Sequence, residues 1–187
     1  MPQTDNDVAA NQTLEYRLPG ASHGASATAQ ALRAIAYGGL TAGILDGVYA
    51  GIVYGWMRGV SSAKVFQFVA SGLVGRYAFS ADWTAILGVA LHFTVAIGAA
   101  ATYWLVALRF PALLKRPVLF GPLYGVAVFA VMRYVVVPLS AVPKQPPAKP
   151  MAFLIALLPH ILFIGPAIVL AASWFGPSKT SAERGSP

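Results

Sequence analysis

Four ionisable side chains interrupt otherwise apolar stretches of the chain: Asp46, His92, Arg133 and His160. A charged group near the middle of a membrane helix costs about 3 kcal/mol on insertion scales, so these side chains are expected to face protein or water instead of lipid. Imidazoles and a carboxylate can exchange protons, and an arginine can act as the counter-ion of an acid. These residue types indicate either proton chemistry or polar contacts that hold helices together.

The composition is typical of integral membrane proteins. The 187 residues are 57% hydrophobic and 10% charged, whereas soluble domains are about one quarter charged. A window of about twenty residues predicts an all-α fold, a four-transmembrane-helix bundle within residues 31–176, with spans at 32–57, 82–108, 118–139 and 151–175. The polar segments 1–30 and 177–187 are predicted to be tails, the first of them disordered.

The tryptophans support these limits, because each lies near the edge of a span, where indoles seek the headgroup boundary: Trp56, Trp83, Trp104 and Trp174. Lys and Arg residues are more numerous on the side of the two termini than on the opposite side. This imbalance predicts that the N- and C-termini are cytoplasmic.

The depth of the ionisable residues follows from the helical rise of about 1.5 Å per residue. Asp46 lies near the centre of its span, and His92, Arg133 and His160 lie about 5–7 Å from the centres of theirs on that rise. Because neighbouring spans run in opposite directions, these offsets all point toward one leaflet. The sequence therefore predicts one buried polar cluster, with Asp46 and Arg133 as counter-ions. Two alternatives stay open: Arg133 can snorkel to the interface, and the cluster can serve only as polar glue between helices.

Two prolines, Pro159 and Pro166, interrupt the fourth span beside His160. A proline cannot donate the usual helical hydrogen bond, so it frees a carbonyl in the preceding turn. We expect carbonyls near Ile155 and Leu162 to accept a bond from a neighbouring side chain or from water.

Residues 61–76 are too short and too polar to cross a bilayer. A possible cap at Ser62 and a shared apolar face predict a short interfacial helix between the first two spans; the face consists of Val65, Phe68, Val69, Gly72 and Leu73. A loop helix packed over the bundle explains the same pattern equally well.

Glycine recurs at every fourth position of the first span: Gly39, Gly43, Gly47, Gly51 and Gly55. This glycine ridge, a zipper of small residues, allows another backbone to approach closely in lipid. The ridge is predicted to pack against a helix of the same chain, or to form a homo-oligomer or a larger membrane complex.

Several kinds of chemistry find no support. The chain has no cysteine, which excludes disulfides, thiol catalysis and cysteine-held metals. It also has no G-x-S-x-G element and no phosphate-binding glycine loop. A metal held by Asp46, His92 and His160 would be repelled by Arg133. We expect neither enzyme activity nor a metal site.

Haem is the one cofactor with a candidate ligand pair. His92 and His160 lie on different spans and could ligate the iron, with Gly88 leaving room for the macrocycle. No haem-attachment motif accompanies them. Without haem, no cofactor is expected.

The formal charge of +7 does not indicate nucleic acid as a partner, because the Lys and Arg residues lie mostly in the tails and between apolar runs. No basic stripe is interleaved with aromatic residues. Anionic lipid headgroups, and therefore the lipid bilayer, are the expected partner.

The stretches that carry a family resemblance are GLTAGILD at 39–46, FQFVASGLVG at 66–75, LHF at 91–93, MRYVVVPLS at 132–140, and PH at 159–160 with GP at 165–166. They resemble the YagU-like family of uncharacterised bacterial inner-membrane proteins. The resemblance implies a multi-pass protein of the bacterial inner (plasma) membrane, and it brings no established chemistry or catalytic residues.

These observations lead to three hypotheses about function. The first is a small non-enzymatic multi-span membrane protein, a packing or complex subunit or an accessory protein with a buried polar cluster. The second is a proton- or ion-conducting or pH-responsive membrane protein that uses Asp46, His92 and His160. The third is a bis-histidine haem electron carrier.

Overall fold

The structure, a computed structural model, describes residues 19–144 and 149–176. Within these ranges the chain is helical and contains no strand. Its longer helices are α2 (Pro19–Arg58), α3 (Ser62–Val74), α4 (Thr84–Arg109), α5 (Pro117–Val131), α7 (Pro150–Pro159) and α8 (Gly165–Phe175). Short helical segments join them: η1 (Gly75–Phe79), η2 (Pro111–Leu114), η3 (Met132–Val136), α6 (Val137–Leu139) and η4 (His160–Ile164).

Four helices in the described part are long and apolar enough to cross a membrane: Ser26–Arg58, Thr84–Arg109, Pro117–Leu139 and Pro150–Phe175. The prediction of an all-α chain with four such helices is confirmed. The third and fourth are continuous helical rods because α5, η3 and α6 follow one another directly, as do α7, η4 and α8.

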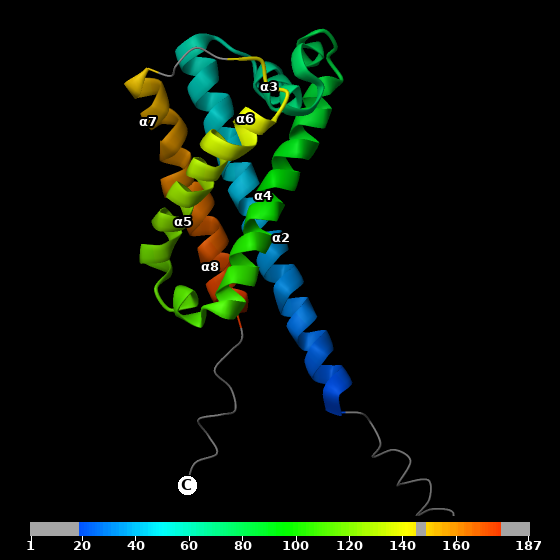
Figure 1. Ribbon diagram of the computed structural model, residues 1–187, viewed down its shortest axis with the longest axis vertical. Helices are drawn as coiled ribbons and strands as arrows, with labels where there is room; N and C mark the ends of the chain where they lie inside the picture. Colours follow the sequence, from blue (N-terminus) through cyan, green and yellow to red (C-terminus); the bar gives the residue numbers. More distant parts are fainter. Residues whose placement is uncertain (1–18, 145–148, 177–187) are drawn as a thin grey trace, which may run out of the picture.

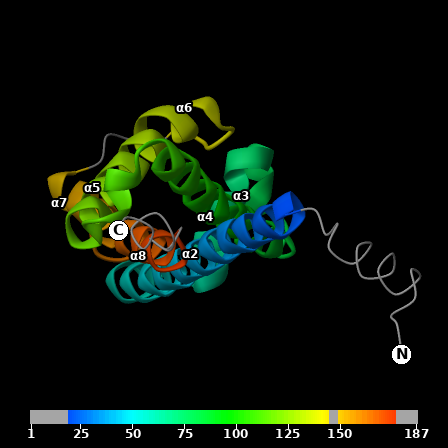
Figure 2. The ribbon, with the colours of Figure 1, turned by 90° about the horizontal axis from the view of Figure 1, so that it is seen from below.

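The four rods alternate in direction. In Figure 1, α2 and α5 run toward the end of the bundle that carries α3, whereas α4 and α8 run away from it. We call these the α3 end and the opposite end. Helix α8 packs against α2 and α5, and α2 also packs against α4; Figure 2 shows α8 between α2 and α5.

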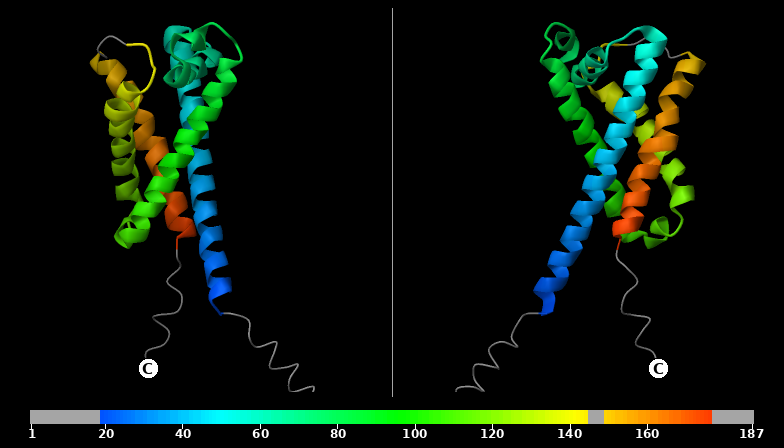
Figure 3. Two further views of the ribbon diagram at one scale, coloured as in Figure 1. Left: turned by 45° about the vertical axis from the view of Figure 1, so that its right-hand side comes forward. Right: turned by 180° about the vertical axis from the view of Figure 1, so that it is seen from behind.

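Helices α4 and α5 meet at the opposite end and diverge toward the α3 end, as Figure 3 shows. Near the opposite end the Tyr124 hydroxyl donates a hydrogen bond to the Ala99 carbonyl over 2.6 Å. The rings of Tyr103 and Tyr124 lie 4.7 Å apart, centroid to centroid. These contacts join α4 and α5 on the side where the two helices approach each other.

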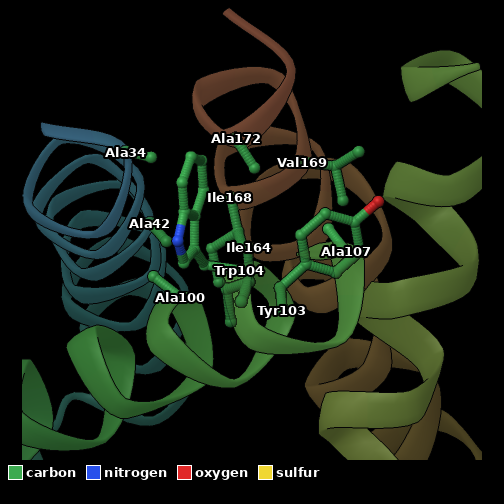
Figure 4. Packing of buried hydrophobic residues seen from close by; sticks show 10 residues of the cluster. All are labelled: Ala34, Ala42, Ala100, Tyr103, Trp104, Ala107, Ile164, Ile168, Val169 and Ala172. Atoms are coloured by element: carbon green, nitrogen blue, oxygen red, sulfur yellow. The ribbon is translucent and has the colours of Figure 1, made fainter. Parts of the chain in front are cut away.

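The apolar core closes the opposite end of the bundle. It is built from alanines of α2 and α4, two aromatic residues of α4, and three branched residues and one alanine of η4 and α8: Ala34, Ala42, Ala100, Tyr103, Trp104, Ala107, Ile164, Ile168, Val169 and Ala172. In Figure 4 the indole of Trp104 lies between α2 and α8. The alanines leave the volume that this large ring fills.

Trp104 corrects one expectation. Only 5% of its surface is exposed, so it is a core residue and not a boundary anchor. The other three tryptophans are largely exposed. A position near the end of an apolar run did not reveal that Trp104 faces alanines on two neighbouring helices.

The predicted tail at residues 1–30 is wrong in part, because α2 begins at Pro19. Proline is well suited to the first turn of a helix, and the following residues are rich in alanine, the strongest helix former. The remainder of that tail, and the tail at 177–187, lie outside the described residues.

Helix α3 is capped one residue earlier than predicted. The side chain of Ser61, and not Ser62, accepts a hydrogen bond from the Lys64 amide over 3.4 Å. The face of α3 packed against the bundle buries Gln67, Ala70 and Ser71, while Phe68 and Leu73 are exposed. The apolar face predicted from the sequence is therefore directed partly outward.

Candidate functional site

The four ionisable residues predicted to cluster line a single cavity of about 320 Å³. Asp46 comes from α2, His92 from α4, Arg133 from η3 and His160 from the start of η4. The cavity occupies the space where α4 and α5 diverge, and Phe68 and Val69 of α3 also line it. Residues from five separated segments of the chain thus meet at one site.

His92 links the cavity to the backbone of α2. Its Nε2 lies 2.8 Å from the Gly43 carbonyl oxygen, and a carbonyl can only accept, so Nε2 carries a proton and donates. Its Nδ1 lies 3.9 Å from an Asp46 carboxylate oxygen. In a neutral imidazole this Nδ1 would be an acceptor facing another acceptor. The protonation state of the pair therefore decides whether the contact is repulsive or attractive.

The predicted ion pair between Asp46 and Arg133 is not formed. Within residues 19–144 and 149–176, Asp46 instead lies beside His92, a contact that is an ion pair only when the imidazole is protonated, and Arg133 makes no ion pair. The cavity of about 320 Å³ lies between the helices that carry these two residues and is large enough to hold water. Asp46 and Arg133 therefore both line the cavity without forming an ion pair with each other.

His160 presents one ring nitrogen to its own helix. Its Nδ1 lies 3.0 Å from the Ala156 carbonyl oxygen, so Nδ1 carries the donated proton. The ring meets Phe129 edge to face, with centroids 5.3 Å apart. Nε2 has no hydrogen-bond partner among the described residues. His160 and His92 both lie close enough to Asp46 to interact with it electrostatically.

Two widened turns carry Arg133 and His160. Segments η3 and η4 are π-helical: the Val137 amide bonds to the Met132 carbonyl, and the Gly165 amide bonds to the His160 carbonyl. In both cases the next residue is a proline, which has no N–H to continue the α-helical ladder. Such turns are frequent at functional sites. Sequence reasoning missed them, although Pro138 and Pro166 were the available signal.

One carbonyl expected to be freed by proline has found a partner. The Tyr49 hydroxyl of α2 donates to the Ile155 carbonyl over 3.0 Å, four residues before Pro159. This confirms the expectation that a side chain would satisfy that carbonyl. The bond joins α2 to α7 one turn from Asp46 along α2.

Removal of this hydroxyl should weaken the bundle slightly. We expect Tyr49→Phe to lower the free energy of unfolding by about 0.6–1 kcal/mol, the usual contribution of such a bond between membrane helices. Unfolding in increasing denaturing detergent, followed by circular dichroism, measures the change. Tyr37→Phe on the same helix is the control, because Tyr37 is exposed; an equal loss in both variants would contradict the assignment.

The glycine ridge packs within the chain. A Cβ added at Gly39 would lie 2.7 Å from the Ile97 backbone, and one at Gly43 would lie 2.8 Å from the Phe93 ring, both on α4. At Gly51 the nearest atom is the hydroxyl of Ser62, 3.2 Å away, at the start of α3. The partners of these ridge positions are therefore α3 and α4.

The tightest glycine contacts lie outside the ridge. A Cβ at Gly88 would overlap the Phe66 carbonyl of α3, and a Cβ at Gly125 would overlap the His160 carbonyl. The space beside Gly88 that the haem hypothesis requires is thus filled by the backbone of α3. This geometry weighs against a macrocycle held by His92 and His160.

A second hollow of about 540 Å³ lies beside α2, where residues of α3 and α4 also line it. Ile44, Val48 and Ser62 are among its lining residues, and it shares Gly43 and His92 with the cavity. We call it the α2 groove. The hydrogen bond from His92 to Gly43 therefore lies in the wall between the groove and the cavity.

Fold and site together define a class: in its described residues, a helical chain with four helices long and apolar enough to cross a membrane, and a cavity between them whose lining includes four ionisable side chains. Comparison with family models, curated proteins and solved structures gives no match. The resemblance to the YagU-like family stays a prediction.

Proposed function

We propose that the four rods span a lipid bilayer, with α3 at one interface and the described ends of α2 and α8 on the other side. Large apolar side chains on the outside of the rods support this proposal, because lipid tails tolerate them and water does not. Phe68, Leu73 and Trp83 are exposed near the α3 end, as suits the headgroup boundary. The bacterial inner membrane, with cytoplasmic termini, is the proposed location.

We further propose that the chain is a proton-conducting or pH-responsive membrane protein. The observation that carries this is the meeting of Asp46, His92, Arg133 and His160 at one cavity without a direct Asp46–Arg133 contact. Polar glue would require the side chains to satisfy one another across a closed contact. Ionisable groups around a space large enough for water suit proton exchange.

The arrangement favours entry of protons from the α3 end. Phe68 and Arg133 line the cavity and are both partly exposed, whereas the core around Trp104 closes the opposite end. A proton would reach the Asp46–His92 pair or His160 through the cavity, and Arg133 would balance the carboxylate charge. Because one end is closed, transfer across the membrane would follow the slow kinetics of a carrier.

The test uses liposomes containing the purified protein and a pH-sensitive dye in their lumen. We expect the wild-type protein to dissipate an imposed pH gradient faster than protein-free liposomes do. Asp46→Asn should reduce the rate to the protein-free level, since the amide cannot exchange a proton in this range. Asp82→Asn is the matched control, because Asp82 is exposed outside the cavity. Equal rates for wild type and Asp46→Asn would refute the proposal.

A non-enzymatic packing or complex subunit is the second candidate. The α2 groove supports it, because exposed Ile44, Val48 and Ile52 flank the glycine ridge there. A homo-oligomer or a larger membrane complex would form along this side of α2. Crosslinking between single cysteines introduced at position 48 would detect such contacts.

A further inference from the structure

The cavity combines a cation with predominantly apolar walls. Apart from Asp46, His92, Arg133 and His160, its lining residues are apolar, and they include Val95, Val128, Phe129 and Met132. Arg133 has no ion-pair partner among the described residues. An unpaired guanidinium beside apolar walls suits a ligand with one anionic end and one apolar end.

The net charge of the cavity sets a second requirement for the binding of an anionic ligand. In the state with Asp46 and Arg133 charged and both histidines neutral, in which the contact between His92 and Asp46 is not an ion pair, the ionisable groups of the cavity sum to zero. Tyr49, the other titratable group near Asp46, has its hydroxyl bonded to Ile155. An anion entering alone would leave an excess negative charge in a low-dielectric site, which is unfavourable. One proton entering with it would restore neutrality.

The hydrogen-bonding groups match this pair of guests. Arg133 offers several donors in a planar fork that fits the two oxygens of a carboxylate. His160 keeps Nε2 without a partner in the described part of the chain, so it can accept the accompanying proton or a bond from a protonated acid. The volume of about 320 Å³ lies at the small end of ligand pockets, which limits the apolar part to a short chain or a single ring.

We propose that the cavity binds a small monocarboxylate with an apolar tail, together with one proton. The carboxylate lies at Arg133, and the tail lies along Val95, Val128 and Phe129. No bond forms or breaks in the ligand: the proton moves from solvent to the cavity and leaves with the anion. This inference rests on the proposed proton function and names an anion that the same site binds together with a proton.

The experiment is calorimetric titration of the purified full-length chain in detergent with hexanoate. We expect binding with a Kd of about 1 mM or tighter, in keeping with the affinity that so small a ligand can reach. Repeating the titration in buffers with different ionisation enthalpies should reveal uptake of about one proton per hexanoate, the number required for neutrality. Acetate, which lacks the tail, and hexanol, which lacks the charge, should each bind at least about 10-fold more weakly.

Three variants assign the site. Arg133→Gln should weaken hexanoate binding by at least about 10-fold, because the carboxylate of the bound ligand loses the guanidinium that balances its charge. Arg133→Lys keeps the charge and should retain most of the affinity. Arg109→Gln is the control: Arg109 is exposed at the end of α4 and does not line the cavity. If Arg133→Gln fails to fold, the affinities of hexanoate, acetate and hexanol for the wild-type protein still test the inference.

Absence of hexanoate binding to the folded wild-type protein would overturn the inference, as would equal binding of hexanol or no effect of Arg133→Gln in a folded variant. Failure of the proposed function gives a different result: gradient dissipation would be the same in wild type and Asp46→Asn. Gradient dissipation that depends on Asp46, in a protein that does not bind hexanoate, would leave the proton function standing and remove the carboxylate.

Discussion

Gly125→Ala is expected to destabilise the bundle by about 2–3 kcal/mol, near the upper end for overpacking a tight contact. The added methyl group would overlap the carbonyl of His160, which belongs to the backbone and cannot rotate away. Helices α5 and η4 would have to separate beside His160, which lines the cavity. Unfolding in denaturing detergent, monitored by circular dichroism, gives the change.

The chain offers a matched control for this substitution. Gly98 is also inside a helix, and a Cβ there would meet nothing within 4 Å. Gly98→Ala should be neutral or stabilising by up to about 1 kcal/mol, because alanine is the better helix former. If both substitutions change stability alike, helix propensity and not the α5–η4 contact determines the effect at Gly125.

Trp104→Ala is expected to lower the free energy of unfolding by about 2–4 kcal/mol, mainly through the cavity left in the core. In a membrane the unfolded helices still contact lipid, so loss of packing is the larger part of this effect. Because the core closes the opposite end of the bundle, the variant should also conduct protons faster per folded molecule. Detergent unfolding and the liposome assay measure the two effects.

Trp174→Ala provides the comparison on the same type of residue. Trp174 is 86% exposed, so its removal should change the unfolding free energy by less than about 0.5 kcal/mol. Equal losses for the two tryptophans would mean that Trp104 does not fill the core as described. It would then resemble the boundary residue expected from its position in the sequence.

The rods could be predicted from the sequence because lipid demands long continuous apolar stretches with satisfied backbones. The predicted spans agree with the helices to within about two residues at most ends, apart from the longer N-terminal part of α2. The prediction that the four ionisable residues meet rested on their depth in the spans. They line one cavity: Asp46, His92, Arg133 and His160. Depth along a helix is fixed by the rise per residue, which needs no knowledge of side-chain packing.

Which groups touch could not be predicted in the same way. Pairing of Asp46 with Arg133 was expected from charge, yet His92 is the partner because its Nε2 is held by the Gly43 carbonyl. The rotation of Arg133 and His160 about their helix axes depends on the π turns before Pro138 and Pro166. The burial of Trp104 depends on alanines far away in the sequence. Contacts of this kind are set by tertiary packing.

The account depends on a water-accessible cavity inside a membrane-spanning bundle, and cysteine accessibility tests this directly. The chain has no cysteine, so a thiol reagent can modify only the single cysteine that is introduced. Val128 lines the cavity, whereas Val126, two residues earlier on α5, is exposed on the outside and does not. In liposomes, a water-soluble thiol reagent should modify Val128→Cys much faster than Val126→Cys, which would face lipid. Equal or reversed rates would contradict the account.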